Sequence, residues 1–146
     1  MATFTKINDF VEHLAEGAHD LDTNQLVVAL SNTAPGAEGS DPTTDGNGLL
    51  ANVTEVAYTN LSTRNITLSA SSQTSGTYKL VLTDLVLTSS GGTSGPFRYV
   101  YVYNDGTVVL INPLICYYDY GSSITLADGE TLTIDFDAAN GLLQIA

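Results

Sequence analysis

The 146-residue chain has little positive charge: four Lys and Arg residues stand against sixteen Asp and Glu, and the formal net charge is −12. Proteins that bind DNA or RNA gain affinity through Lys and Arg side chains, which replace the counterions of the phosphates. The composition therefore argues against a nucleic-acid-binding protein. The excess of negative charge also favours solubility.

Cysteine, histidine and tryptophan are scarce or missing. The single cysteine, Cys116, has no disulfide partner within the chain and lies between Ile115 and Tyr117, so we expect a small buried apolar side chain. The two histidines, His13 and His19, give little material for a catalytic triad or a metal site, and we expect both on the surface. Phosphate-binding loops and nucleophile elbows are also missing, so we predict that the protein is not an enzyme and uses no cofactor.

Carboxylates are plentiful, which makes a calcium site the main alternative to a metal-free protein. The segment DPTTDGNG, residues 41–48, has the wrong ligand spacing for a calcium-binding loop. Asp20 with Asp22, or Asp135 with Asp137, would form an ion site or suit glycosidase chemistry only if folding brought other groups near them. We predict no metal site.

Long apolar runs are also missing. Spanning a bilayer takes roughly 20 consecutive apolar residues, and no segment approaches that length. The chain begins without a basic and apolar leader, so we expect a soluble protein without a membrane partner, made in a cytoplasm.

What the chain does have is a series of short β-branched and aromatic runs separated by Gly, Pro, Asn and Asp. The densest part, from Pro96 to Phe136, includes an expected hairpin turn at Asn104-Asp105-Gly106 and a break at Pro113. The predicted strands are 25–30, 49–56 (weaker), 65–69, 77–82, 84–88, 97–103, 107–111, 114–120, 123–126, 130–136 and 142–145. Their spacing is typical of an all-β antiparallel sandwich or jelly roll. We predict one domain, 1–146, with a helix and lead-in in 1–20 and the sandwich in 21–146.

One amphipathic helix is expected near the amino end, where apolar residues recur at helical spacing: Phe4, Ile7, Phe10, Val11 and Leu14. We expect Gly17 just past its end. This helix either covers an open end of the sandwich or anchors the chain to another subunit.

Two further segments are candidates for contact with a partner. Ser31 to Gly48 is a long Gly- and Pro-rich loop, which is a functional surface, a segment ordered by a partner or an ordinary flexible connection. Tyr99, Tyr101 and Tyr103 alternate along a strand and share one face. They are half-buried between sheet and loop, form a subunit interface, or stack on sugar rings.

Several longer motifs cover most of the chain. From Phe4 to Leu30 it has the pattern FxKxNxFxEHLAxGxHDLDxxxLxVAL, followed by SNTAP, and later GPFRYVYVYND, PLICYYDYGSSITLADGETLTIDF and NGLL. In these motifs the chain resembles a family of small bacteriophage virion proteins. The resemblance implies a capsid decoration (cement) protein or another head or tail component, made in the bacterial host cytoplasm.

Packaged DNA repels a strongly acidic protein, so we expect a place on the outer surface of the capsid. The expected partners are the major capsid protein and further copies of the chain, as a homotrimer on three-fold positions. The alternatives are a tail, neck or fibre component and a carbohydrate-binding module displayed on the virion. The predicted partner-contact residues are Phe4, Ile7, Phe10, Val11, Leu14, Pro35, Asp41, Asp45, Tyr99, Tyr101 and Tyr103.

Overall fold

A computed structural model describes residues 2–36 and 47–146 of the chain. The regular secondary structure of the described residues is mostly β-strand, the strands pair antiparallel, and one short α-helix lies near the amino end. This confirms the predicted antiparallel β class with one helix. The finer assignment to a sandwich or jelly roll stays a prediction.

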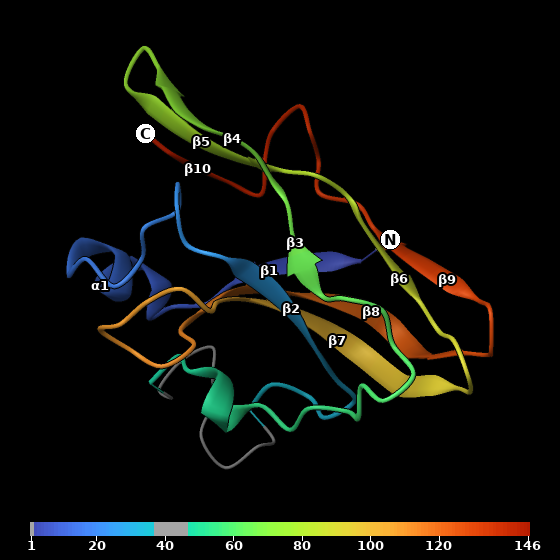
Figure 1. Ribbon diagram of the computed structural model, residues 1–146. Coiled ribbons are helices and arrows are strands. Elements are labelled where there is room, and N and C mark those ends of the chain that lie inside the picture. Colours follow the sequence, from blue (N-terminus) through green and yellow to red (C-terminus); the bar gives the residue numbers. More distant parts are fainter. Residues whose placement is uncertain (1, 37–46) are drawn as a thin grey trace.

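The largest sheet has five strands in the order β1, β8, β7, β2, β3 (Figure 1). Their bounds are β1 Thr3–Lys6, β8 Leu114–Leu126, β7 Ser94–Asn104, β2 Leu26–Ser31 and β3 Asn65–Ile66. The adjacent inner strands β7 and β2 are buried on both faces over the length of their pairing, from Leu26 opposite Asn104 to Ser31 opposite Tyr99. Continuous β-branched and aromatic runs such as Leu26–Ser31 are suited to this position.

The other strands form a three-stranded and a two-stranded sheet, which lie to one side of the five-stranded sheet (Figure 1). The first has the order β10 (Leu143–Ile145), β5 (Thr77–Leu82), β4 (Leu68–Thr74), and the second pairs β6 (Leu85–Thr88) with β9 (Thr131–Ile134).

The apolar side chains of these smaller sheets belong to the same core as the five-stranded sheet. Leu80 and Leu87 have no exposed surface, and Ile134 is 1 % exposed. The ring of Phe136, just after β9, lies 6.4 Å from the ring of Tyr118 in β8. The described strands therefore enclose one hydrophobic core.

The predicted helix over Phe4 to Leu14 is wrong in its first half. Thr3–Lys6 is strand β1, with Phe4 opposite Tyr118 of β8, and helix α1 comprises only Phe10–Ala15. Pairing with β8 satisfies the backbone of β1, an outcome that spacing within one segment does not reveal. The expected end of the helix is confirmed, since Gly17 has φ +78° and follows the last turn.

The predicted return strand Thr107 to Ile111 is also wrong. These residues form a loop, and β7 pairs instead with β8 beyond Pro113. The two predicted strands 114–120 and 123–126 are one strand, because β8 continues through Gly121 at φ +79°. The weak extended segment 49–56 contains a single 3₁₀ turn, η1 (Leu50–Asn52).

Candidate interaction surfaces

The residue types that bind metal ions do not gather into a site in residues 2–36 and 47–146. No group of three or more His, Cys, Asp or Glu side chains there is placed to hold a metal ion. Cys116 is buried, as predicted, and burial raises the pKa of its thiol above the usual value. This thiol is therefore neutral and screened from solvent at ordinary pH.

Both histidines lie in the interior, so the prediction of surface positions is wrong. His13 is 9 % and His19 7 % exposed, and their ring centroids are 6.2 Å apart. His13 faces the body with Phe10, three residues earlier on α1. Asn104 Nδ2 lies 3.2 Å from His19 Nδ1. Burial, and secondly the charge of His13, lowers the pKa of His19 to about 4.

The structure separates the predicted helix-face contacts into buried and exposed residues. Ile7 and Phe10 are 0 % and 3 % exposed and belong to the core, so they do not reach a partner in this fold. Phe4 and Val11 are 43 % and 52 % exposed, and Leu14 is half-buried. Of this set, Phe4 and Val11 present the most surface to a partner.

The three alternating tyrosines of β7 are in the core, which contradicts their assignment as partner contacts. Tyr99, Tyr101 and Tyr103 are 6 %, 0 % and 6 % exposed. Tyr117, opposite Tyr101 on β8, has its ring 5.4 Å from that of Tyr101 and 6.3 Å from that of Tyr99. The alternating spacing of the tyrosines correctly predicts that they share one face of the strand. The strand is central in the sheet, however, and both of its faces are covered.

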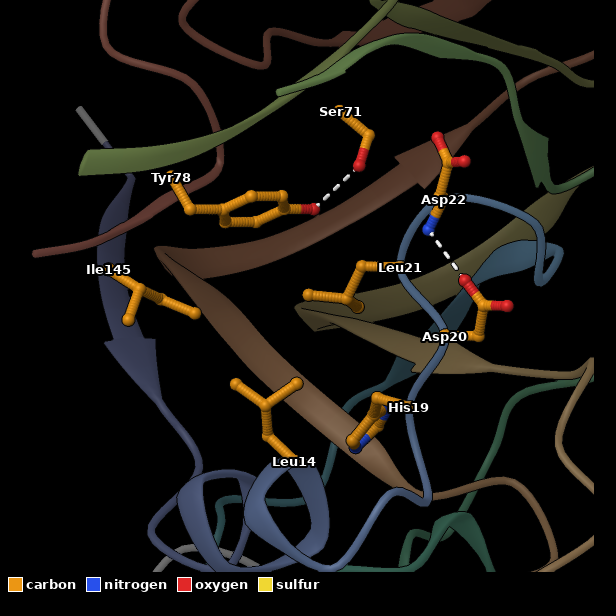
Figure 2. A pocket seen from close by; sticks show the side chains of 8 residues that line it. All are labelled: Leu14, His19, Asp20, Leu21, Asp22, Ser71, Tyr78 and Ile145. Carbon is orange, nitrogen blue, oxygen red and sulfur yellow. Dashed lines mark hydrogen bonds between the residues drawn. The ribbon is translucent and has the colours of Figure 1, made fainter. Parts of the chain in front are cut away.

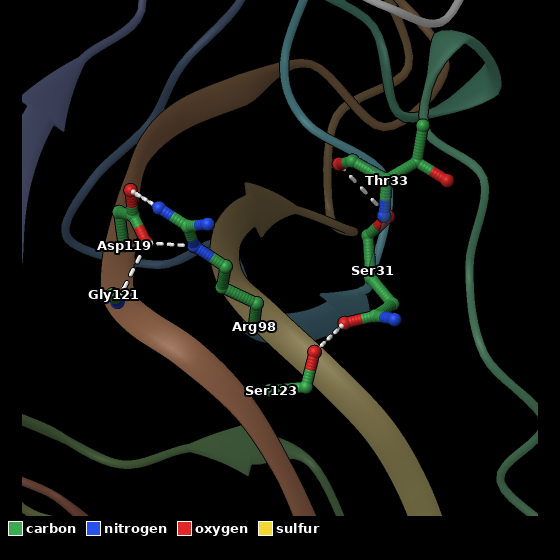
Figure 3. Close-up of polar contacts among 7 residues, drawn as sticks. Ser31, Thr33, Arg98, Asp119, Gly121 and Ser123 are labelled. Atoms are coloured by element: carbon green, nitrogen blue, oxygen red, sulfur yellow. Dashed lines mark hydrogen bonds and ion pairs between the residues drawn. The ribbon is translucent and has the colours of Figure 1, made fainter.

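The predicted long loop is described only at its two ends. Pro35 is half-buried, whereas Asp41 and Asp45 lie outside the described residues. Figure 3 shows the start of this loop, where Ser123 donates a hydrogen bond of 2.7 Å to Asn32 and so ties β8 to the end of β2.

A loop that the sequence analysis assigned to a strand exposes three apolar side chains. Val108 is 99 %, Val109 62 % and Ile111 80 % exposed, and we call residues 107–111 the apolar loop. A run of apolar, β-branched residues occurs both in core strands and in exposed binding loops, so composition alone does not distinguish the two. The sequence does contain one indication of a loop. Few residues separate Gly106 from Pro113, which leaves little room for a strand with a turn at each end.

Hydrogen bonds hold both ends of the apolar loop. Asp105 N–H donates to the Gln25 carbonyl at 2.9 Å, and Asn104 N–H to the Pro113 carbonyl at 3.0 Å. Gly106 packs so closely that a Cβ there would lie 2.8 Å from Asn24 Cβ. The loop is therefore presented from a fixed base.

Among the hollows on the surface of the described residues, two are considered as candidate sites. The first, of about 400 Å³, lies between α1, the 19–22 segment and the β4–β5–β10 sheet. Figure 2 shows Leu14, Leu21 and Ile145 directed toward it, and Tyr78 hydrogen-bonded to Ser71 at 2.9 Å.

The second hollow is larger, about 770 Å³, and lies between the β1 and β8 strands and the segment that follows β9. We call it the acidic groove. Its walls include the rings of Phe4, Tyr118 and Tyr120 and the carboxylates of Asp135 and Asp137. The spacing of the two aspartates indicated that they lie together. That the aromatic residues lie beside them was not predicted, because it depends on the pairing of β1 with β8.

Comparison with known proteins gave no match: no family model, curated protein or solved structure is significantly similar to this chain. Within the described ranges, none of the helical segments has the length and apolar character needed to cross a bilayer.

Proposed function

We propose that this chain is a non-enzymatic structural protein of a bacteriophage virion: a capsid decoration protein on the outer surface of the head. In this role it stabilises contacts between major capsid subunits and acts as a homotrimer. The proposal includes a β-sandwich or jelly-roll architecture, supported by the two sets of strands whose apolar faces meet in one core.

The observation that carries the proposal is the apolar loop. Val108, Val109 and Ile111 are exposed together in a chain whose net charge is −12. Apolar area removed from water contributes roughly 25 cal/mol per Å², so covering these side chains on another protein is favourable. A cluster of exposed apolar residues within a charged surface is typical of a protein interface.

The anchored base of the loop supports a docking function further. A loop that is already ordered loses less conformational entropy on binding than a flexible one. Hydrogen bonds from Asn104 and Asp105 hold the side that follows β7, and Leu50 N–H donates to the Asn112 carbonyl at 2.9 Å on the other side.

The test is binding to capsid shells that lack this chain, measured by co-sedimentation. The Val109→Ser variant is expected to bind at least about fivefold more weakly, because it removes apolar area from the contact. Val86→Ser is the matched control, since Val86 is 51 % exposed on β6, and it is expected to bind like the unmodified chain. Failure of the unmodified chain to bind shells overturns the decoration proposal, and association with purified tails would replace it with a tail component.

A further inference from the structure

The acidic groove combines a wall of aromatic rings with the carboxylates of Asp135 and Asp137. Phe4 and Tyr118 are directly opposite in the β1–β8 pairing, and their rings meet edge to face with centroids 5.5 Å apart. Tyr120 is on the same face of β8, two residues further along. These rings are partly exposed, so the groove has an aromatic wall that solvent reaches.

The carboxylates act on the same rings. Burial raises the pKa of Tyr120, and the charge of Asp135 raises it further. The pKa of Tyr118 is raised chiefly by burial, then by Cys116 and Tyr120, and also by the charges of Asp135 and Asp137. The negative charges therefore face the aromatic wall across the groove.

The two aspartates differ in what they already bind. Asp137 accepts hydrogen bonds from the N–H groups of Ala139 and Asn140 and from the Asn140 side chain, at 2.9, 3.0 and 2.7 Å. Lys79, whose Nζ donates to the Ala139 carbonyl at 2.9 Å, compensates part of its charge. Asp135 is exposed and has no hydrogen bond or ion pair to another residue in the described part of the chain.

One cation of the chain itself, Lys79, acts on the groove, where it compensates part of the charge of Asp137 but not that of Asp135. Of the four Lys and Arg residues, Arg64 lies against Tyr58 and Glu55, Arg98 binds Asp119, and Lys79 holds the Ala139 carbonyl. The fourth, Lys6, ends β1 and does not line the groove. Among the described residues that line the groove, none is Lys, Arg or His. A cation that pairs with Asp135 must therefore come from outside the described fold.

We propose that the acidic groove binds an arginine or lysine side chain on an extended basic segment of a partner protein. The cation pairs with Asp135 and lies against the rings of Tyr118 and Tyr120, a combination that suits a guanidinium, which is planar and weakly hydrated. The charge balance favours this occupant over a neutral sugar, which can donate hydrogen bonds to Asp135 but cannot neutralise its charge. The inference rests on the proposed function only in identifying the partner as a capsid protein.

A pair of peptides gives a sharp test, because citrulline has the shape of arginine without its charge. The probes are fluorescein-labelled Gly-Arg-Val-Arg-Gly and the same peptide with both arginines replaced by citrulline, measured by fluorescence anisotropy at about 150 mM salt, where diffuse attraction is largely screened. The arginine peptide is expected to bind at least about tenfold more tightly than the citrulline peptide.

Variants of the chain locate the binding. Asp135→Asn and Tyr120→Leu are each expected to weaken binding of the arginine peptide about tenfold. Glu12→Gln is the matched control, because it removes the same charge from an exposed position on α1. Equal losses in Asp135→Asn and Glu12→Gln, or equal binding of the two peptides, overturn the proposal. Binding of maltohexaose with no binding of the arginine peptide also overturns it and identifies a glycan site.

The two proposals fail in different ways. If the unmodified chain and Asp135→Asn bind capsid shells equally, the groove is not the capsid contact, so the basic segment does not belong to the capsid protein while the decoration function stands. If the unmodified chain binds the arginine peptide in the groove but does not bind shells, the decoration function fails and the groove keeps its specificity for a basic segment.

Discussion

His19 packs between the ring of Phe10, at a centroid distance of 5.1 Å, and the amide of Asn104, and its burial leaves little water to solvate an imidazolium. Its neutral form is therefore the one that the fold accommodates. A buried side chain that ionises near neutral pH links folding to protonation, even where it has no role in binding.

The stability of the protein is expected to fall as the pH falls from about 6.5 to about 4, because His19 binds a proton in the unfolded chain before it does so in the folded one. The pKa is lowered on folding, so the contribution is fully present above the unfolded value and is lost below it. The full loss is up to about 3 kcal/mol. Urea unfolding followed by circular dichroism at pH 7, 5.5 and 4.5 measures it.

His19→Gln is the control for this prediction, since glutamine keeps a polar side chain that does not titrate. Its unfolding free energy is expected to change less over the same pH interval. Parallel pH dependences for the two proteins would show that other groups cause the loss.

At the scale of the elements, the ion pair between Arg98 and Asp119 links the two longest strands. Arg98 Nε and Nη2 donate to the two oxygens of Asp119 at 2.7 and 2.9 Å, and Asp119 also accepts from Gly121 N–H at 2.7 Å (Figure 3). This arrangement holds β7 to β8 where β8 passes through the left-handed conformation at Gly121. It lies at the surface, so solvent weakens it.

Arg98→Lys is expected to lower the free energy of unfolding slightly, because lysine cannot make the two parallel hydrogen bonds and solvent screens the pair. Chemical denaturation of four proteins measures the coupling: the unmodified chain, Arg98→Lys, Asp119→Asn and the double variant. In the Asp119→Asn background the lysine substitution should have almost no further effect. An equal loss in both backgrounds would mean that Arg98 acts through its packing on Tyr99 rather than through Asp119.

Local pattern was sufficient to predict most of the strands but not their partners. The runs that became β2, β5, β6 and β7 combine β-branched residues with flanking turn residues, and their positions were predicted. Thr107 to Ile111 has the same composition but forms a loop, because β8 occupies the edge of β7 that this segment would need. Phe4 illustrates the reverse error, since helical spacing was outweighed by pairing with a strand more than one hundred residues away.

The same limit applies to the candidate site. Asp135 and Asp137 were paired by spacing, and Tyr118 and Tyr120 were visible as aromatic residues of one strand. Their meeting in one groove depends on β1 lying beside β8 and on the chain after β9 passing near both. Contacts of this kind follow from tertiary structure, and no local pattern encodes them.

At the scale of the whole molecule, the net charge of −12 acts in opposite directions on the two associations proposed for the chain. Copies of an acidic protein repel one another, so a homotrimer must overcome this repulsion with apolar contacts. A basic partner is attracted by the same charge. Added salt screens both effects, because the Debye length shortens from about 10 Å at 0.1 M to about 3 Å at 1 M.

The two associations are therefore expected to respond to salt with opposite signs. Between about 50 and 500 mM NaCl, self-association measured by sedimentation velocity should strengthen, while affinity for the arginine peptide should fall several-fold. The Asp135→Asn variant distinguishes the attraction of this one carboxylate from that of the net charge. Its affinity for the arginine peptide should depend less on salt. Its self-association should respond to salt like that of the unmodified chain. Self-association that weakens as salt is added would mean that opposite charges, and not apolar contacts, hold the copies together.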